Sequence, residues 1–388
     1  MADPSIYNEF YLLLCEISYG LKSKELTYQK QLNRKDTLDM QYIKDQYLIR
    51  AINKLYAFAL RNNITDSNGN ILAPRDETDA IVNYFSRNIS EWIDDWNDKL
   101  KEALEPIYGM EPLIQLRGGN KYLCNESCFE LALQCTLYDQ DAEQRKLFTV
   151  LRGLEQEAYV YSRKYIISHP LIDSLDLNEF QHKLKDLDVD ERKINKIIAY
   201  AYEPIPDDAL YKCSCCGWTI SKGSDGSLYC IDSRCKRNTD NYKNVEQLGD
   251  TRNLKRLKPG VMRYMAIPGK LELCIENHCL SNGIRYELWP NKDAYDVKVY
   301  INNKYILAID AKDYKNAFIL SKKILDEGNL FAVDDWNEGY IVIPDEAANI
   351  KVDYCEVVNK ALRRKFGTNV SCIKFSDLIK IISEVHKI

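Results

Sequence analysis

Five of the chain's 13 cysteines lie between residues 211 and 240, in a segment with several Gly and Ser residues and little hydrophobic periodicity. A first pair, Cys213 and Cys216, is separated by 13 residues from a second pair, Cys230 and Cys235. Zinc binds four thiolates at tetrahedral angles, and two short turns that each donate two sulfurs supply them without a large hydrophobic core. The spacing therefore predicts a zinc ribbon that folds around one structural Zn²⁺.

Two features of this cysteine segment leave alternatives open. Cys215 can exchange roles with Cys213, and the gap between Cys230 and Cys235 is wider than the usual two residues. A closed four-cysteine site has no open coordination position, so it stabilises a module and does no chemistry. A redox-active or unliganded cluster is the alternative interpretation.

The composition excludes two broad classes of protein. The chain has 388 residues, 45% of them hydrophobic, and a formal net charge of −5. It is therefore too apolar to be mainly disordered and not basic enough for a nucleic-acid coat protein. Residues 1–10 lack the pattern of a signal peptide, and no run of 18 uncharged apolar residues occurs. We expect a cytoplasmic protein with no membrane partner, in which most cysteines are ordinary thiols.

The sequence pattern changes twice along the chain, which predicts three domains. Residues 1–205 are helical in pattern and form a recognition or assembly region, which two prolines in the linker 203–208 bring to an end. Residues 206–250 form the zinc ribbon, and residues 251–388 form a basic linker and an α/β domain. We expect single helices at 6–21, 39–61, 81–100, 141–167 and 177–202.

The C-terminal segment has the element order αβββαβ, followed by a helical tail. This order gives a multidomain α + α/β fold class with the mixed domain at the C-terminal end. The expected elements are a helix at 268–280, strands at 284–289, 295–301 and 305–311 with a tight turn at Asn302 and Asn303, a helix at 317–327, a strand at 340–343 and one or two terminal helices.

Two carboxylates and an ammonium group converge at the end of the predicted hairpin. Side-chain alternation places Lys312 on the same face as Asp310, and the hairpin brings Asp296 alongside. Asp296, Asp310 and the carbonyl of Ala311 are oxygen ligands suited to Mg²⁺. Such a cation polarises a phosphodiester and activates water, while Lys312 orients that water or offsets negative charge. An exposed hairpin with ordinary salt bridges is the alternative.

The same residues resemble a known catalytic motif. Asp296, a gap of 13 residues and Asp310-Ala311-Lys312 are similar to the PD-(D/E)xK motif of restriction-endonuclease-like nucleases, and αβββαβ is the order of their core. The resemblance implies a C-terminal restriction-endonuclease-like domain that uses Mg²⁺ or Mn²⁺. The sequence departs from the motif at Tyr295, where proline is expected.

The resemblance also implies a third carboxylate, which in these nucleases often comes from the helix before the first strand. Glu276 is slightly preferred over Glu272 for this role. Glu287, near the end of the first strand, is a rival. The choice among the three stays open at this point.

A narrower resemblance covers more of the chain. A helical front half with the segment 163–170, the CxxCGW ribbon at 213–218 and the Tyr-Glu-Leu-Trp-Pro segment at 286–290 are together similar to the nuclease partner encoded beside prokaryotic Piwi-RE proteins. The resemblance implies an antiviral or anti-plasmid defence system with an Argonaute-like (Piwi-like) protein and a helicase as companions.

The segment 251–270 contains six basic residues and no acidic residue. Lysine and arginine contacts to phosphates position a nucleic-acid backbone without reading its sequence, so we expect DNA to bind here. Trp218 and Tyr264 are candidates for stacking on bases if they are exposed. A basic linker that only offsets the acidic helical region is an equally weighted alternative. The predicted DNA-binding residues are Arg252, Lys255, Arg256, Lys258 and Arg263.

Together, these patterns predict a metal-dependent DNA endonuclease in which Asp296, Asp310, Lys312 and Glu276 are catalytic. Double-strand cleavage with one active site per chain favours a homodimer. The alternative is a non-catalytic zinc-ribbon adaptor with a decayed nuclease fold.

Overall fold

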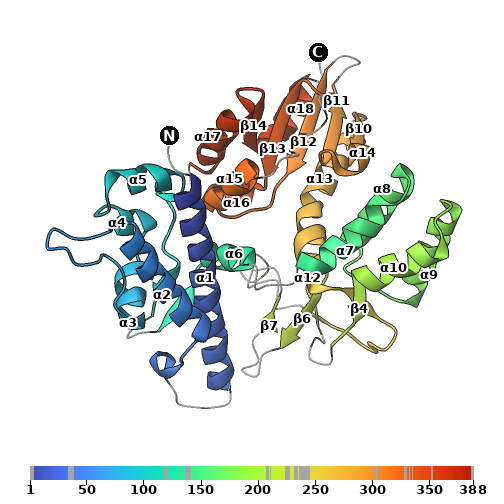
Figure 1. Cartoon of the computed structure of the whole chain (residues 1–388). Coiled ribbons are helices and arrows are strands. Elements are labelled where there is room, and N and C mark those ends of the chain that lie inside the picture. Colours follow the sequence, from blue (N-terminus) through green and yellow to red (C-terminus); the bar gives the residue numbers. More distant parts are fainter. Residues whose placement is uncertain are drawn as a thin grey trace. The chain divides into compact units, whose positions relative to one another are not determined.

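The computed structural model divides the chain into two compact units, Met1–Tyr138 with Tyr314–Lys322, and Asp139–Asp313 with Lys323–Ile388 (Figure 1). None of the helices that the structure describes combines the length and apolar character of a membrane-spanning segment. The described residues are 4–33, 39–117, 121–135, 141–206, 209, 211–222, 228–230, 235, 245–301, 305–326, 330–331, 333, 335–350 and 353–385.

The first unit is built mainly from helices that pack on α1 (Pro4–Asn33). Phe10 of α1 contacts the rings of Phe58 and Trp96, at centroid distances of 5.4 and 5.5 Å. Such aromatic contacts bury a large apolar area. The other described elements of this unit are η1 (Met40–Tyr42), α2 (Gln46–Arg61), α3 (Glu77–Asp79), η2 (Ala80–Phe85), α4 (Ile89–Ile93), α5 (Asp98–Leu104), η3 (Glu105–Ile107), the antiparallel strands β1 (Ile114–Leu116) and β2 (Tyr122–Cys124), α6 (Glu126–Gln134) and the first part of α15 (Ala317–Asp326).

The segment 81–100 is not the single helix that its hydrophobic pattern predicts. It forms three short pieces, which are η2, α4 and α5. The apolar positions are still buried, as Trp92 and Trp96 show. The break arises because the side chain of Asn97 caps the N-terminus of α5 and starts a new helix there.

The segments 141–167 and 177–202 also form two helices each, where one was predicted. Gly153 lies at the first break. Asp190 caps the helix after the second break, accepting a hydrogen bond from a backbone N–H with its side chain. The four helices are α7 (Asp141–Arg152), α8 (Gln156–Ser168), α9 (Ser174–Asp186) and α10 (Glu191–Ala201).

Residues from both sides of the cysteine segment form one small sheet in the second unit. In this sheet, β9 (Lys255–Leu257) lies between β3 (Leu171–Ile172) and β4 (Tyr202–Pro204), with antiparallel pairing on both sides. Parts of the predicted linkers at 203–208 and 251–270 are therefore strands. The ribbon is a four-stranded sheet with the order β7 (Leu228–Tyr229), β6 (Thr219–Lys222), β5 (Tyr211–Lys212) and β8 (Glu246–Gln247).

A five-stranded mixed sheet forms the C-terminal part, in the order β10-β11-β12-β13-β14. The first three strands are antiparallel, and β12, β13 and β14 are parallel. The predicted αβββαβ order is present, β14 is an additional strand, and the predicted turn at Asn302 and Asn303 lies outside the described residues. The elements are α12 (Pro259–Val261), η5 (Met262–Ala266), α13 (Ile267–Ser281), β10 (Arg285–Leu288), α14 (Pro290–Asp293), β11 (Val297–Tyr300), β12 (Ile306–Ala311), α15, β13 (Glu338–Ile343), α16 (Asp345–Ile350), α17 (Tyr354–Phe366), β14 (Val370–Lys374) and α18 (Phe375–Val385).

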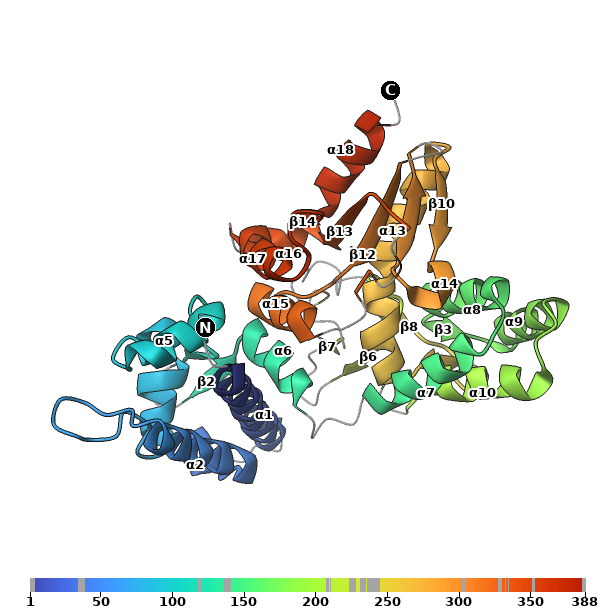
Figure 2. The ribbon, with the colours of Figure 1, turned by 45° about the horizontal axis from the view of Figure 1, so that its top comes forward.

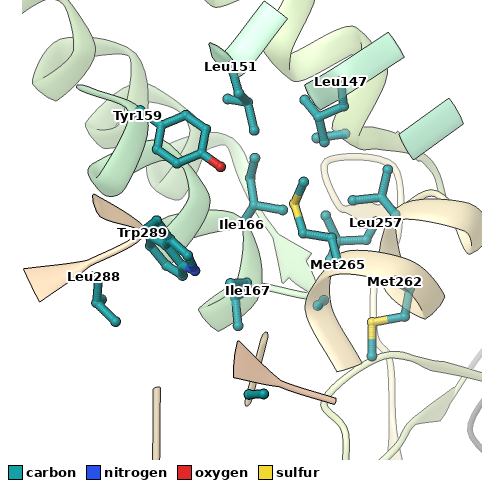
Figure 3. Close-up of a cluster of buried hydrophobic side chains, with 14 of the residues drawn as sticks. Leu147, Leu151, Tyr159, Ile166, Ile167, Leu257, Met262, Met265, Leu288 and Trp289 are labelled. Carbon is teal, nitrogen blue, oxygen red and sulfur yellow. The ribbon is translucent and has the colours of Figure 1, made fainter. Parts of the chain in front are cut away.

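Helix α13 connects this sheet to the helices that precede the ribbon. It packs along β10, β11 and β12 on one side and contacts α8 on another (Figure 2). The core at this junction contains Tyr159 and Ile167 of α8 together with Trp289, and Figure 3 shows Tyr159 facing Trp289. Their ring centroids are 6.4 Å apart in a T-shaped arrangement. The contact between α8 and α13 is close at Gly269, where an added Cβ would lie 2.4 Å from Cδ1 of Ile167.

We expect Gly269→Ala to destabilise the protein by about 1–3 kcal/mol because the added methyl overlaps Ile167. This overlap outweighs the gain of about 1 kcal/mol in helix propensity. Ile167→Ala alone removes core packing, but in the double variant it also makes room for the new methyl. The measurement is urea unfolding of both single variants and the double variant. A double variant whose loss of stability equals or exceeds the sum of the single losses would contradict this packing.

Candidate functional site

Asp296 and Asp310 meet where β11 and β12 pair. Val297 lies opposite Ile309 in this antiparallel pair, so continuing the register by one residue places Asp296 opposite Asp310. Both carboxylates are buried, with relative exposures of 7% and 5%. The backbone N–H of Ala311 donates a hydrogen bond of 2.7 Å to Oδ2 of Asp296. The backbone of β12 therefore holds the carboxylate of Asp296 beside Asp310.

Lys312 extends this group of charges. Its Nζ donates to Oδ1 of Asp310 at 3.0 Å, and its backbone N–H donates to the carbonyl of Val342 in β13 at 2.8 Å. The side chain remains partly accessible, at 23%. The structure thus brings Asp296, Asp310 and Lys312 together, with an ammonium group at the solvent-facing edge of two buried carboxylates.

The three candidate glutamates lie in different places. Glu272 is buried, and it is close enough for its charge to affect the pKa of Asp296. Glu276, one helical turn later, instead accepts hydrogen bonds from Lys164 and Tyr286 at 2.7 and 3.0 Å. The structure therefore places Glu272, and not Glu276, beside the aspartates.

Glu287 lies apart from these buried carboxylates. It is exposed, and its Oε1 accepts a hydrogen bond of 2.6 Å from the hydroxyl of Tyr300. In the β10–β11 register it lies opposite Lys298. Its surroundings are those of a solvated strand residue.

A buried arginine joins the carboxylates to α8. Nη2 of Arg163 lies 3.1 Å from both oxygens of Glu272 and 3.7 Å from Oδ1 of Asp296, and Nη1 forms an ion pair with Asp293. The guanidinium also lies over the ring of Trp289, 4.4 Å from its centroid. Arg163 falls within the segment 163–170 of the family resemblance. No local pattern marks it as a site residue, because its carboxylate partners are more than 100 residues away in the chain.

The electrostatics of this carboxylate site favour an added cation. Burial raises the pKa of Asp296 well above its ordinary value of 3.8, and the charges of Glu272 and Asp310 raise it further. Burial also raises the pKa of Glu272, although Arg163 opposes this shift. When ionised, Glu272, Asp293, Asp296 and Asp310 carry four negative charges. The cations paired with them are Arg152, Arg163 and Lys312, so an excess of negative charge remains. This excess favours an added cation, and oxygen ligands suit Mg²⁺ or Mn²⁺.

The four predicted zinc ligands form a second, separate cluster. Cys213, Cys216, Cys230 and Cys235 are buried, and their sulfurs all lie within 4.8 Å of one another. Among the described residues, this is the one group of three or more His, Cys, Asp or Glu side chains gathered this tightly. Cys215 is exposed and lies outside this cluster, in which Cys213 is the first of the four cysteines.

The local backbone and charge also suit metal binding at this cluster. The turn from Cys213 to Gly217 closes with a hydrogen bond of 2.9 Å from the N–H of Gly217 to the carbonyl of Cys213. Gly217 has a φ of +78°, a conformation that favours glycine. Hydrogen bonds among the four thiols lower the pKa of Cys213 and raise the pKa of Cys230 and Cys235, so the thiols of the metal-free cluster share their protons unevenly. The arrangement can hold a tetrahedral ion.

The predicted DNA-binding residues differ in how available they are. Arg256 is buried, and its guanidinium donates to Glu203 and Thr219 at 2.8 Å each. Arg252 is exposed but pairs with Asp250 at 2.6 Å, and the other three are half-buried. Arg256 therefore has a structural role, because its guanidinium links β9 to β4 and to β6 of the ribbon.

Trp218 has a structural role as well. It is 7% exposed, and its indole N–H donates to the carbonyl of Leu257 at 2.8 Å. The guanidinium of Arg256 lies over its ring, 4.5 Å from the centroid. Trp218 thus does not offer its face to a nucleic-acid base.

The raised pKa of Asp296 makes the stability of the metal-free protein depend on pH. The folded state binds this proton more tightly than the unfolded state, so stability is lost as the pH rises from about 4 through the folded pKa. We expect Asp296→Asn to be more stable than wild type at pH 8, by about 1.4 kcal/mol for each unit of pKa shift, and to lose this advantage toward pH 4.

The measurement is the melting temperature in a chelating buffer from pH 4 to 8. Asp377→Asn, at an exposed position of α18, serves as the matched control. An Asp296→Asn advantage that grows as the pH falls would contradict the raised pKa.

The region that contains the carboxylate site is similar to one protein family. Residues 269–387 match the family model described as "REase associating with pPIWI_RE". The matched region includes Glu272, Asp296, Asp310 and Lys312, whereas Arg163 and the four clustered cysteines lie outside it. No curated protein and no solved structure matches the chain.

Proposed function

We propose that this protein is a metal-dependent endonuclease that hydrolyses DNA phosphodiester bonds at the end of the β11–β12 hairpin. The observation that carries the proposal is the position of Asp296 and Asp310, buried and opposite each other with Lys312 alongside, inside the region similar to a restriction-endonuclease (REase) family. Buried carboxylates that only support a fold are ordinarily paired with cations. The excess of negative charge at this site therefore favours a functional role.

The order and direction of the C-terminal strands support a restriction-endonuclease-like core. Helix α13 is followed by the antiparallel strands β10, β11 and β12, and β13 then joins β12 in parallel after α15. This is the αβββαβ order that the sequence resemblance implies. The carboxylates lie at the junction of the antiparallel and parallel parts of the sheet.

Each site residue has a proposed role in this reaction. Asp296, Asp310 and the carbonyl of Ala311 would hold Mg²⁺ or Mn²⁺, with Glu272 in place of Glu276 as the third carboxylate. The bound cation supplies Lewis-acid polarisation of the phosphate and a lowered pKa for the attacking water. Lys312, held by Asp310, orients that water and offsets the negative charge that develops on the phosphate oxygens.

The remaining parts of the chain support binding and assembly. The four clustered cysteines would hold one structural Zn²⁺ and so fold the ribbon. Of the basic residues after the ribbon, Arg252, Lys255, Lys258 and Arg263 remain candidates for DNA phosphate contacts. The family description supports association with a Piwi-like protein in a defence system. A helicase companion and a homodimer belong to the same proposal.

We expect Asp310→Ala combined with Lys312→Ala to lower DNA cleavage by about 10³-fold or more while leaving DNA binding intact. The assay uses supercoiled, linear and single-stranded DNA with Mg²⁺, Mn²⁺ or EDTA. Asp377→Ala with Lys380→Ala removes an exposed ion pair of α18, at 2.9 Å, and serves as the matched control. If wild type binds DNA but never cleaves it, with or without a Piwi-like partner, the chain is a non-catalytic adaptor.

The zinc proposal has an independent test. We expect about one Zn²⁺ per purified wild-type chain, and Cys230→Ser should lose it and unfold the ribbon, because a structural zinc site contributes directly to folding. Cys215→Ser changes an exposed thiol of the same segment and should keep the metal. Elemental analysis and melting temperatures of the three proteins give the answer. Wild-type protein without zinc, or equal zinc in the two variants, would contradict the assignment.

A further inference from the structure

We propose that Gln156 and Arg163 of α8 are positioning residues of the nuclease site, which hold the backbone turn between β10 and β11 and through it Asp296. The inference rests on the proposed function, because it assigns these residues to the same carboxylate site. Both residues lie outside residues 269–387, so the region similar to the nuclease family lacks them.

The turn between β10 and β11 has an unusual backbone. Trp289, Asn291, Lys292 and Asp293 have φ values of 46°, 53°, 56° and 85°. Residues other than glycine rarely adopt this left-handed region of backbone conformation. Several such residues close together keep this conformation only where surrounding contacts impose it. The contacts that impose it are therefore part of what shapes the site.

Gln156 supplies two of these contacts from the first turn of α8. Its Nε2 donates to the carbonyl of Trp289 at 2.9 Å, and its Oε1 accepts from the N–H of Lys292 at 3.1 Å. One amide side chain therefore holds the strained segment at two backbone positions that are three residues apart. The N–H of Trp289 donates a backbone hydrogen bond of 2.8 Å to the carbonyl of Asp296. The position of Trp289 therefore constrains the backbone of the aspartate.

Arg163, two helical turns later on α8, contacts the acidic side chains of the turn and of the site. It pairs with Asp293 in the turn, contacts both oxygens of Glu272 at 3.1 Å and reaches Asp296 at 3.7 Å. The planar guanidinium presents several donors in fixed directions, so it orients carboxylates as well as neutralising them. With 5% exposure and Trp289 over its face, it does not reach a bound phosphate and acts through the carboxylates.

Arg163→Met tests the side-chain role. We expect Mn²⁺ to bind about 10- to 100-fold more weakly, as measured by titration calorimetry, because residues that orient metal ligands have effects of this size. The rate constant kcat should fall while KM for DNA stays near its wild-type value, and Arg163→Lys should restore part of the Mn²⁺ affinity. The matched control is Arg192→Met, at an exposed position of α10.

Gln156→Ala tests the turn without burying or removing a charge. Gln156 is exposed, so this variant should fold even if Arg163→Met does not. Loss of its two hydrogen bonds should weaken Mn²⁺ binding about three- to tenfold. Gln181→Ala, a helical glutamine in α9, should bind Mn²⁺ as wild type does.

The results separate this inference from the proposed function. Weaker Mn²⁺ binding in Gln156→Ala and in folded Arg163→Met supports the inference, even if wild type does not cleave DNA and the nuclease proposal fails. Unchanged or tighter Mn²⁺ binding in Gln156→Ala overturns the inference. Tighter binding in folded Arg163→Met also overturns it, because it would show that the arginine competes with the metal. Wild-type protein that binds no Mn²⁺ overturns both proposals.

Discussion

The buried ion pair between Arg163 and Glu272 is the contact on which the second unit depends. Removing a charge from water is costly unless it is paired and hydrogen-bonded, so a guanidinium that is 5% exposed must keep its partners. Those partners come from α13 and from the turn after β10, while the arginine comes from α8. One buried charge therefore fixes a helix from before the ribbon against the sheet that follows it.

This ion pair also shapes the chemistry of the carboxylate site. Arg163 and Lys312 neutralise part of the negative charge of the buried carboxylates, and burial raises the pKa of Asp296 and Glu272. Lys312 and Arg163 oppose the raised pKa of Asp296, and Arg163 opposes that of Glu272, which favours the ionised carboxylates that bind metal. An excess of negative charge remains to attract a metal ion, beside a lysine that is still partly open to solvent.

The sequence predicts the parts of the structure that depend on local patterns. Side-chain alternation correctly identifies β12 and the proximity of Asp310 and Lys312, and cysteine spacing identifies the four clustered sulfurs. Helix breaks are harder to predict, because a capping residue such as Asn97 interrupts a continuous apolar pattern. The choice between Glu272 and Glu276 is also beyond local pattern, since both are buried and Arg163, 109 residues from Glu272, marks one of them.

The most direct test of the central claim is the location of Mn²⁺ in crystals of the full-length chain. Anomalous difference maps collected on both sides of the zinc absorption edge distinguish Mn²⁺ from zinc at the cysteines. The account predicts a Mn²⁺ peak within about 2.0–2.3 Å of carboxylate oxygens of both Asp296 and Asp310. Mn²⁺ bound elsewhere, with no peak between these two aspartates, would contradict it.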